Sequence, residues 1–185
     1  MKIDRKKIID YLNDQIDKSS RALYHASDWF TDLINNEKGK KAAAWDCIIK
    51  LKKETDEEFI AYLNKELNDK QGKHDLLDSL HDLMMVQEKK NNKKRSGKLF
   101  NTDDIRKFLE RELNKANDEW RNSCTEEEKI SAYSKRMCAL NCLLEIEKSE
   151  QVVFESYVNK ELNETLGKYS LLHDLFDFIE KKERY

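Results

Sequence analysis

Two histidines and two aspartates within nine residues are the clearest candidates for metal chemistry in this sequence. His74, Asp78, His81 and Asp82 fall at i, i+4, i+7 and i+8, so a helix places them on one face. Imidazole and carboxylate groups are common ligands of divalent metals. A related segment later in the chain retains only the last position, as Asp177, and no His-Glu-x-x-His pattern is present. We therefore interpret the four residues as a solvated helix face and expect no bound metal.

The four cysteines are the next candidates for chemistry. Cys138 and Cys142 lie one helical turn apart and could give two thiolates to zinc, but no second Cys or His pair has matching spacing. Cys47 and Cys142 are flanked by aliphatic residues, which is typical of small buried hydrophobes. With Cys124 they form no CxxC motif and are too few for a disulfide scaffold. We expect reduced thiols, no cofactor and no catalytic residue.

A basic segment, residues 89–99, is the strongest polar feature of the chain. It contains six basic side chains, no acid and a Ser-Gly pair. The basic residues are Lys89, Lys90, Lys93, Lys94, Arg95 and Lys98. Clustered cations bind nucleic acid by releasing counterions, but no aromatic residue is interleaved for base stacking. We favour a solvated linker and keep contact with nucleic acid or a partner as the alternative.

The chain contains a long internal similarity. When residues 40–82 are laid on 135–177, a shift of 95 positions without a gap, 17 of the 43 pairs are identical. The opening segments, roughly 3–26 and 103–122, align only after a further two-residue shift. The sequence therefore predicts three parts: a first helical repeat at 1–88, the basic linker at 89–99, and a second helical repeat at 100–185.

Apolar spacing of three and four residues predicts the helices that must position any site. Gly72 and Gly167 each lie between two amphipathic patterns, so we predict that each closes a helix with a positive φ. We expect Leu76, Leu80, Leu171 and Leu175, which follow them, to be buried. Two further pairs of apolar stripes are predicted: Phe59, Tyr62, Leu63 and Leu67 with Phe154, Tyr157, Val158 and Leu162; Trp45, Cys47, Ile48 and Leu51 with Leu140, Cys142, Leu143 and Ile146.

Three polar signals mark predicted helix boundaries. Thr55 with Glu58 forms a capping-box signature, whereas the second repeat has Ser149 and Val152 near that place, where no break is predicted. Thr102 precedes two aspartates and is the predicted N-cap of the helix after the linker.

Composition favours an all-α fold, and the internal similarity favours two pseudo-symmetric helical-bundle halves with three to four helices each. There is no proline, there are only 4 glycines, and 39% of the residues are charged. Three Trp, 7 Tyr and 7 Phe supply anchors for a folded core. No apolar run reaches the roughly 18 residues of a membrane helix, and the N-terminal residues lack a signal-peptide pattern, so a cytoplasmic location without membrane contact is expected.

The absence of a catalytic motif favours a non-enzymatic interaction protein that binds and occludes a macromolecular partner, most simply a protein with a basic surface. A small, proline-free, Lys/Asn/Glu-rich chain also fits the profile of phage or mobile-element inhibitors of nucleic-acid-directed defence, the anti-CRISPR class. That association is one of composition alone. The alternative is a nucleic-acid-binding helical protein that uses residues 89–99. The sequence leaves a homodimer open.

Overall fold

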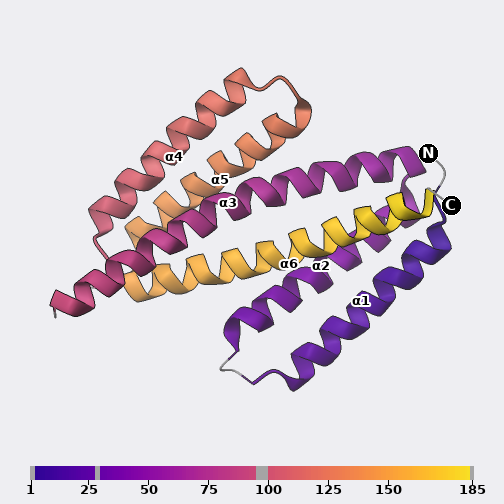
Figure 1. The fold of residues 1–185 in the computed structure, drawn as a ribbon, viewed down its shortest axis with the longest axis horizontal. Coiled ribbons are helices and arrows are strands. Elements are labelled where there is room, and N and C mark those ends of the chain that lie inside the picture. The colour runs from indigo at the N-terminus through magenta and orange to yellow at the C-terminus, as the bar shows by residue number, and fades with distance from the viewer. Residues whose placement is uncertain (1–2, 28–29, 95–99, 184–185) are drawn as a thin grey trace. The chain divides into compact units, whose positions relative to one another are not determined.

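The chain is helical throughout the part that the structure describes. This computed structural model describes residues 3–27, 30–94 and 100–183, without the side chains of 90–94 and 180–183. Over these residues there are six α-helices and no strand, which confirms the predicted all-α class (Figure 1). The helices are α1 (Arg5–His25), α2 (Thr31–Lys53), α3 (Asp56–Lys94), α4 (Thr102–Asn122), α5 (Glu126–Lys148) and α6 (Gln151–Glu183).

The helices form two compact units that do not follow the order of the chain. Unit 1 comprises Met1–Lys70 with Asn163–Tyr185, and unit 2 comprises Gln71–Leu162. Helices α3 and α6 therefore each contribute one part to each unit. The predicted boundary at residues 89–99 separates the two similar stretches of sequence. The boundaries of the two compact units lie elsewhere, inside α3 and inside α6. Helix α3 also continues through Lys94, so the first part of the predicted linker is helical.

Each unit has its own apolar core, built from the predicted stripes. Leu171 and Leu175 of α6 belong to the core of unit 1, and Leu76 and Leu80 of α3 belong to that of unit 2; all four are buried, as predicted. The largest fully buried side chains include Phe59, Leu12, Leu51 and Leu63 in unit 1, and Phe100, Phe154, Met84 and Leu109 in unit 2. The core of unit 1 thus joins helices from the two ends of the sequence, whereas the core of unit 2 is built from its middle part.

The two predicted glycine helix stops are wrong. Gly72 lies inside α3 and Gly167 inside α6, and neither has a positive φ. A Cβ on Gly72 would lie 2.8 Å from the Oγ of Ser131 in α5 and closer still to its carbonyl oxygen. A Cβ on Gly167 would similarly meet the backbone of Asn36 in α2. These glycines let two helix backbones touch, which any side chain would prevent.

A third glycine completes the crossing in unit 1. Gly39 of α2 faces the backbone of Glu164 in α6, where an added Cβ would lie 2.9 Å from the carbonyl carbon. Helices α2 and α6 therefore cross with Gly39 and Gly167 on opposite sides of the contact. The backbone of the other helix packs directly against each of the two glycines.

The predicted helix boundaries are correct in part. The capping box that begins α3 is confirmed: the Thr55 N–H donates to Glu58 at 2.8 Å and the Glu58 N–H donates to the Thr55 hydroxyl at 3.3 Å. The N-cap of α4 is Asn101 instead of Thr102, and its side-chain oxygen accepts from the N–H of Asp103. The chain also breaks between Lys148 and Gln151, where no break was predicted.

Arg5 joins the starts of α1 and α3 to the end of α2. Its guanidinium donates to the carbonyl oxygens of Leu51 (2.6 Å) and Glu54 (2.7 Å), which the end of a helix leaves unpaired, and to the carboxylate of Asp56 (2.7 Å). The Ile3 N–H also donates to Asp56. The hydrogen bonds from Ile3 and Arg5 lower the pKa of Asp56 below its ordinary value of 3.8.

Replacing Gly72 or Gly167 with alanine should lower the free energy of unfolding. In an open helix this change gains about 1 kcal/mol, but overpacking costs roughly 1 to 3 kcal/mol, and here backbone atoms are in the way. Urea unfolding followed by circular dichroism measures the difference. Gln71→Ala, at an exposed neighbouring position, is the control and should change stability little. A stabilised glycine variant would contradict the close crossing.

The Asp56→Asn variant should be less stable than the wild type near neutral pH, with a difference that shrinks in acid. Because folding lowers the pKa of Asp56, the ionised carboxylate stabilises the fold above its ordinary pKa, and this contribution is lost as the pH falls through the folded value. Urea unfolding at about pH 7, 5 and 3 tests the trend. Asp10→Asn, at an exposed position on α1, is the control. A difference that stays constant over this range would exclude the proposed role.

Candidate functional site

The basic segment predicted as a binding site lies mostly beyond the described side chains. Lys89 is exposed near the end of α3. The other five positions lie outside the described residues or their described side chains: Lys90, Lys93, Lys94, Arg95 and Lys98. The choice between linker and binding surface for residues 89–99 therefore stays a prediction.

The four residues of the candidate metal face all belong to the part of α3 in unit 2. Asp78 and Asp82 are exposed, and His74 and His81 are half-buried. Over the described residues, no three His, Cys, Asp or Glu side chains come together as a metal-binding group. The helix face supplies too few convergent ligands for a metal centre.

Three of the four thiols lie in the cores. Cys47, Cys138 and Cys142 are buried and Cys124 is exposed, and none of the four forms a disulfide. Burial raises the pKa of the Cys47 thiol to about 12. A hydrogen bond with Cys138 and burial raise the pKa of Cys142. A thiol is nucleophilic as the thiolate, so neither Cys47 nor Cys142 is suited to catalysis at neutral pH.

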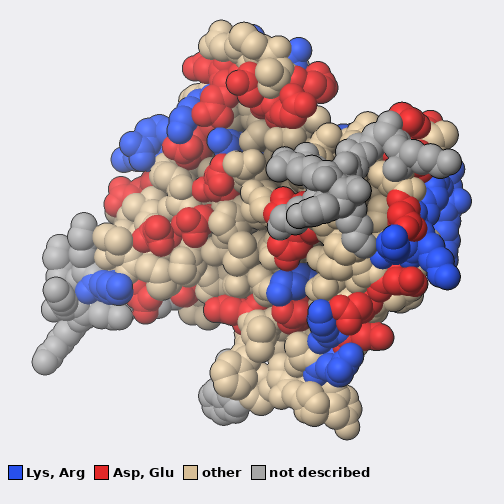
Figure 2. Space-filling model, turned by 45° about the vertical axis from the view of Figure 1, so that its right-hand side comes forward, with Lys and Arg blue, Asp and Glu red and all other residues tan. Residues whose placement is uncertain are grey.

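Acidic and basic side chains are both spread over the visible face of the molecule (Figure 2). The turn of the α1–α2 hairpin, at the bottom of that view, is mainly uncharged. Tyr24 and Phe30 are strongly exposed there, at 85% and 60%.

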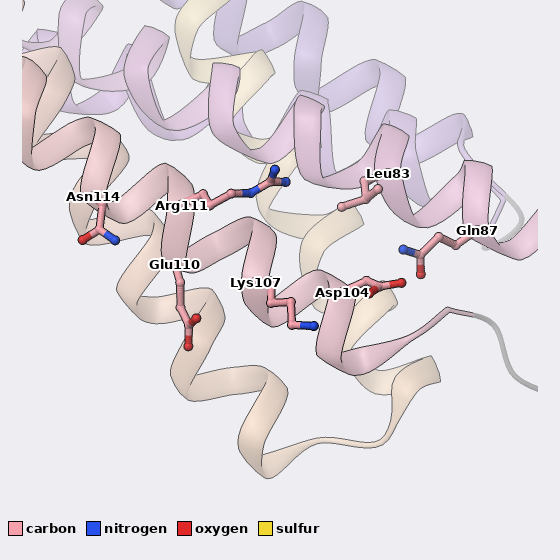
Figure 3. A pocket seen from close by; sticks show the side chains of 7 residues that line it. All are labelled: Leu83, Gln87, Asp104, Lys107, Glu110, Arg111 and Asn114. Carbon is pink, nitrogen blue, oxygen red and sulfur yellow. The ribbon is translucent and has the colours of Figure 1, made fainter.

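A cleft of about 620 Å³ lies between α3 and α4 of unit 2. In Figure 3, Arg111 extends from α4 toward α3 and Gln87 from α3 toward α4, whereas Glu110 points away. The lining is predominantly polar, with two acids and two bases: Leu83, Gln87, Asp104, Lys107, Glu110, Arg111 and Asn114. Small-molecule sites are mostly apolar with a few convergent polar groups, and this cleft has the opposite composition.

The outer side of α2 presents apolar side chains to solvent with a basic rim. Lys38, Ala42, Trp45, Ile49 and Lys52 follow one another at helical spacing on this side, and we call them the α2 outer face. Trp45 is 48% exposed and Ile49 is 46% exposed. Exposed apolar residues gathered on one face, with a polar rim, are typical of an interaction surface.

Lysines also flank the α2 outer face. Lys41 and Lys53 lie beside it, and Asp46 is the acidic residue next to it. The neighbouring Lys40 and Lys50 are paired within the helix, with Glu37 and Glu54 respectively. The rim of the face is therefore predominantly positive although the whole chain carries a formal charge of -2.

The outer side of α5 is a second apolar face. Tyr133, Met137, Leu140 and Leu144 follow one another at i, i+4, i+7 and i+11, and we call them the α5 outer face. Tyr133 and Leu144 are about half exposed, at 49% and 53%, Met137 is slightly less exposed, and Leu140 is half-buried. The opposite side of α5 lies in the core through Cys142 and its neighbours.

The prediction that Trp45 is buried is wrong. The spacing of the apolar residues in α2 explains why its side chain is exposed. The buried stripe of α2 is Ala44, Cys47, Ile48 and Leu51, at i, i+3, i+4 and i+7. Trp45 follows Ala44 and is rotated from that stripe by about 100°. The stripe from Ala44 to Leu51 is already complete without Trp45. The sequence therefore contained a signal that the side chain of Trp45 points outward.

Comparisons with protein-family models, with curated proteins and with solved structures found no match. Within the described ranges, none of the helices combines the length and the apolar character needed to cross a bilayer. The candidate site therefore depends on the geometry of the two outer faces alone.

Thiol chemistry offers a direct check of the two cores. With Ellman's reagent under native conditions, we expect one thiol per chain, Cys124, to react quickly, because the other three are buried. Those three should react only after denaturant is added. Cys124→Ser should remove the fast phase. Fast reaction of two or more thiols would show that a core is more open than described.

Proposed function

We propose that this chain is a non-enzymatic interaction protein that binds a macromolecular partner through the α2 outer face. The observation that carries the proposal is the exposure of Trp45 and Ile49 side by side on a helix whose opposite face is buried. Tryptophan is enriched among residues that dominate binding energy when a partner covers it. The surrounding lysines favour a partner whose surface is apolar at the centre and acidic at the rim.

The proposed partner chemistry differs from the sequence-based expectation of a basic partner. That expectation came from the chain outside residues 89–99, where the removal of six of the 35 basic residues leaves 29 against 37 acidic ones, and it concerns acidic side chains spread over the surface. On the α2 outer face an apolar centre and a charged rim coincide, and the rim is basic. Local charge at the contact governs complementarity more directly than net charge.

A test compares capture by the wild type and by a Trp45→Ala/Ile49→Ala variant. The protein is immobilised, exposed to extract from a candidate host, and the bound proteins are quantified by mass spectrometry. We expect the specifically bound proteins to fall by about tenfold or more, as for loss of a hot-spot residue. The control is Val152→Ala/Val153→Ala, which removes two exposed apolar side chains from α6. Equal capture by both variants would contradict the proposal.

Nucleic-acid binding is the second candidate, because Trp45 lies among lysines and could stack on a base. A gel shift with single-stranded and duplex DNA at several salt concentrations separates the two functions. Nucleic-acid binding predicts a steep salt dependence, which Lys38→Glu/Lys52→Glu should flatten. Weak DNA binding without salt dependence would exclude the nucleic-acid function and leave protein binding as the remaining candidate.

A narrower proposal is that the partner is a nuclease of a nucleic-acid-directed defence system, as for anti-CRISPR proteins of phage. Its support is composition: a small, proline-free chain rich in Lys, Asn and Glu. Expression in bacteria with such a system should restore transformation by a targeted plasmid. The Trp45→Ala/Ile49→Ala variant should fail to restore it if the α2 outer face makes the contact.

We also infer that the chain arose by duplication of a three-helix segment. In support, α1 and α4 both have 21 residues, and α2 and α5 both have 23. The contacts of Gly72 with Ser131 and of Gly167 with Asn36 are related by the 95-residue shift.

A further pair of contacts also follows this shift. Gln151 takes the position of Asp56 and donates to the carbonyl oxygen of Phe100 at 2.7 Å. Asp56 likewise holds the start of α1, through Ile3 and Arg5.

A further inference from the structure

The α5 outer face has a charge pattern that the α2 outer face lacks. It forms an apolar strip without a charged interruption from Tyr133 to Leu144, which is about 17 Å at 1.5 Å per residue. On one flank, Lys129 lies before the strip and Glu147 lies after it, and both are exposed. On this flank the strip is therefore bordered by opposite charges at its two ends. The exposed Glu126 and Lys148 lie at the same two ends, outside this flank.

We propose that the α5 outer face binds the α5 outer face of a second copy of this chain, with the two helices antiparallel. Antiparallel pairing about the centre of the strip brings Tyr133 opposite Leu144 of the partner helix and Met137 opposite Leu140. The same register places Lys129 close to Glu147 of the other copy, twice by symmetry.

The charges argue against the other arrangements. Parallel pairing would keep Lys129 of one copy at the opposite end of the strip from Glu147 of the other, so this attraction would not form. At the positions of α2 related by the 95-residue shift, Ile34 replaces Lys129 and Lys52 replaces Glu147, so an antiparallel α2 pair would form no ion pair on that flank. The strip on α5 is thus self-complementary in one register, whereas the strip on α2 is not.

The contact is modest in size, which sets the expected affinity. Four apolar side chains per copy form a smaller contact than the roughly 1,600 Å² of a standard interface. We therefore expect a dissociation constant in the micromolar range, about 1 to 100 µM, and a dimer that forms as the protein is concentrated. This association is independent of the α2 outer face and of its proposed partner.

Sedimentation equilibrium of the full chain up to about 200 µM tests the proposal. We expect the wild type to dimerise and Met137→Lys to stay monomeric, with circular dichroism confirming that the exposed substitution leaves the helices intact. Trp45→Lys, which places a lysine on the α2 outer face, is the matched control and should dimerise like the wild type. A monomeric wild type, or a dimer unaffected by Met137→Lys, would overturn the proposal.

A charge exchange tests the register. Lys129→Glu and Glu147→Lys, each alone, should weaken dimerisation by at least about fivefold, because two symmetric attractions become repulsions. The double variant should return to near the wild-type dissociation constant. If the single variants weaken the dimer and the double variant does not recover, the antiparallel register is wrong.

Discussion

Contact between helix backbones at glycine is the constraint on which the two units depend. A glycine in the middle of a helix weakens it, so its presence has to be offset elsewhere. Here the offset is packing, because Gly39 and Gly167 let α2 and α6 approach until backbone meets backbone, and Gly72 does the same for α3 and α5. The long helices α3 and α6 can then supply their leucines to the cores at close range. Small residues at close crossings are better known from membrane helices, but the steric reason is the same in water.

The helical class, the buried stripes and the capping box of α3 were accessible from the sequence, because each depends on neighbours within one or two turns. The structural role of Gly72 was not accessible from the sequence, since a glycine between two amphipathic patterns can either end a helix or allow another helix backbone to pack against it. Which of the two occurs depends on the packing of Gly72 against Ser131, which is remote in sequence. Trp45 was assigned to the core because aromatic residues are usually anchors, although the adjacent stripe was already complete. The division of α3 and α6 between the units likewise arises from packing that no local pattern encodes.

The two outer faces show how related surfaces acquire different partners through their rims. Three positions related by the 95-residue shift are apolar on both helices: Ala42, Trp45 and Ile49 match Met137, Leu140 and Leu144, whereas Lys38 matches Tyr133. The hydrophobic contribution to binding is thus available on either face and selects little by itself. The charged residues beside each face therefore distinguish between partners, because Lys52 of α2 occupies the position that corresponds to Glu147 of α5.

The division of α6 between the two units has a consequence for synthesis on the ribosome. The core of unit 1 needs Leu171, Leu172 and Leu175, which are made more than a hundred residues after Leu63 of the same core. Unit 2 has its whole sequence once Leu162 has been made, whereas unit 1 waits for nearly the last turn of the chain. The N-terminal helices therefore emerge first and complete their core last. In that interval their apolar stripes are exposed to chaperones, and contacts of such long sequence separation slow folding.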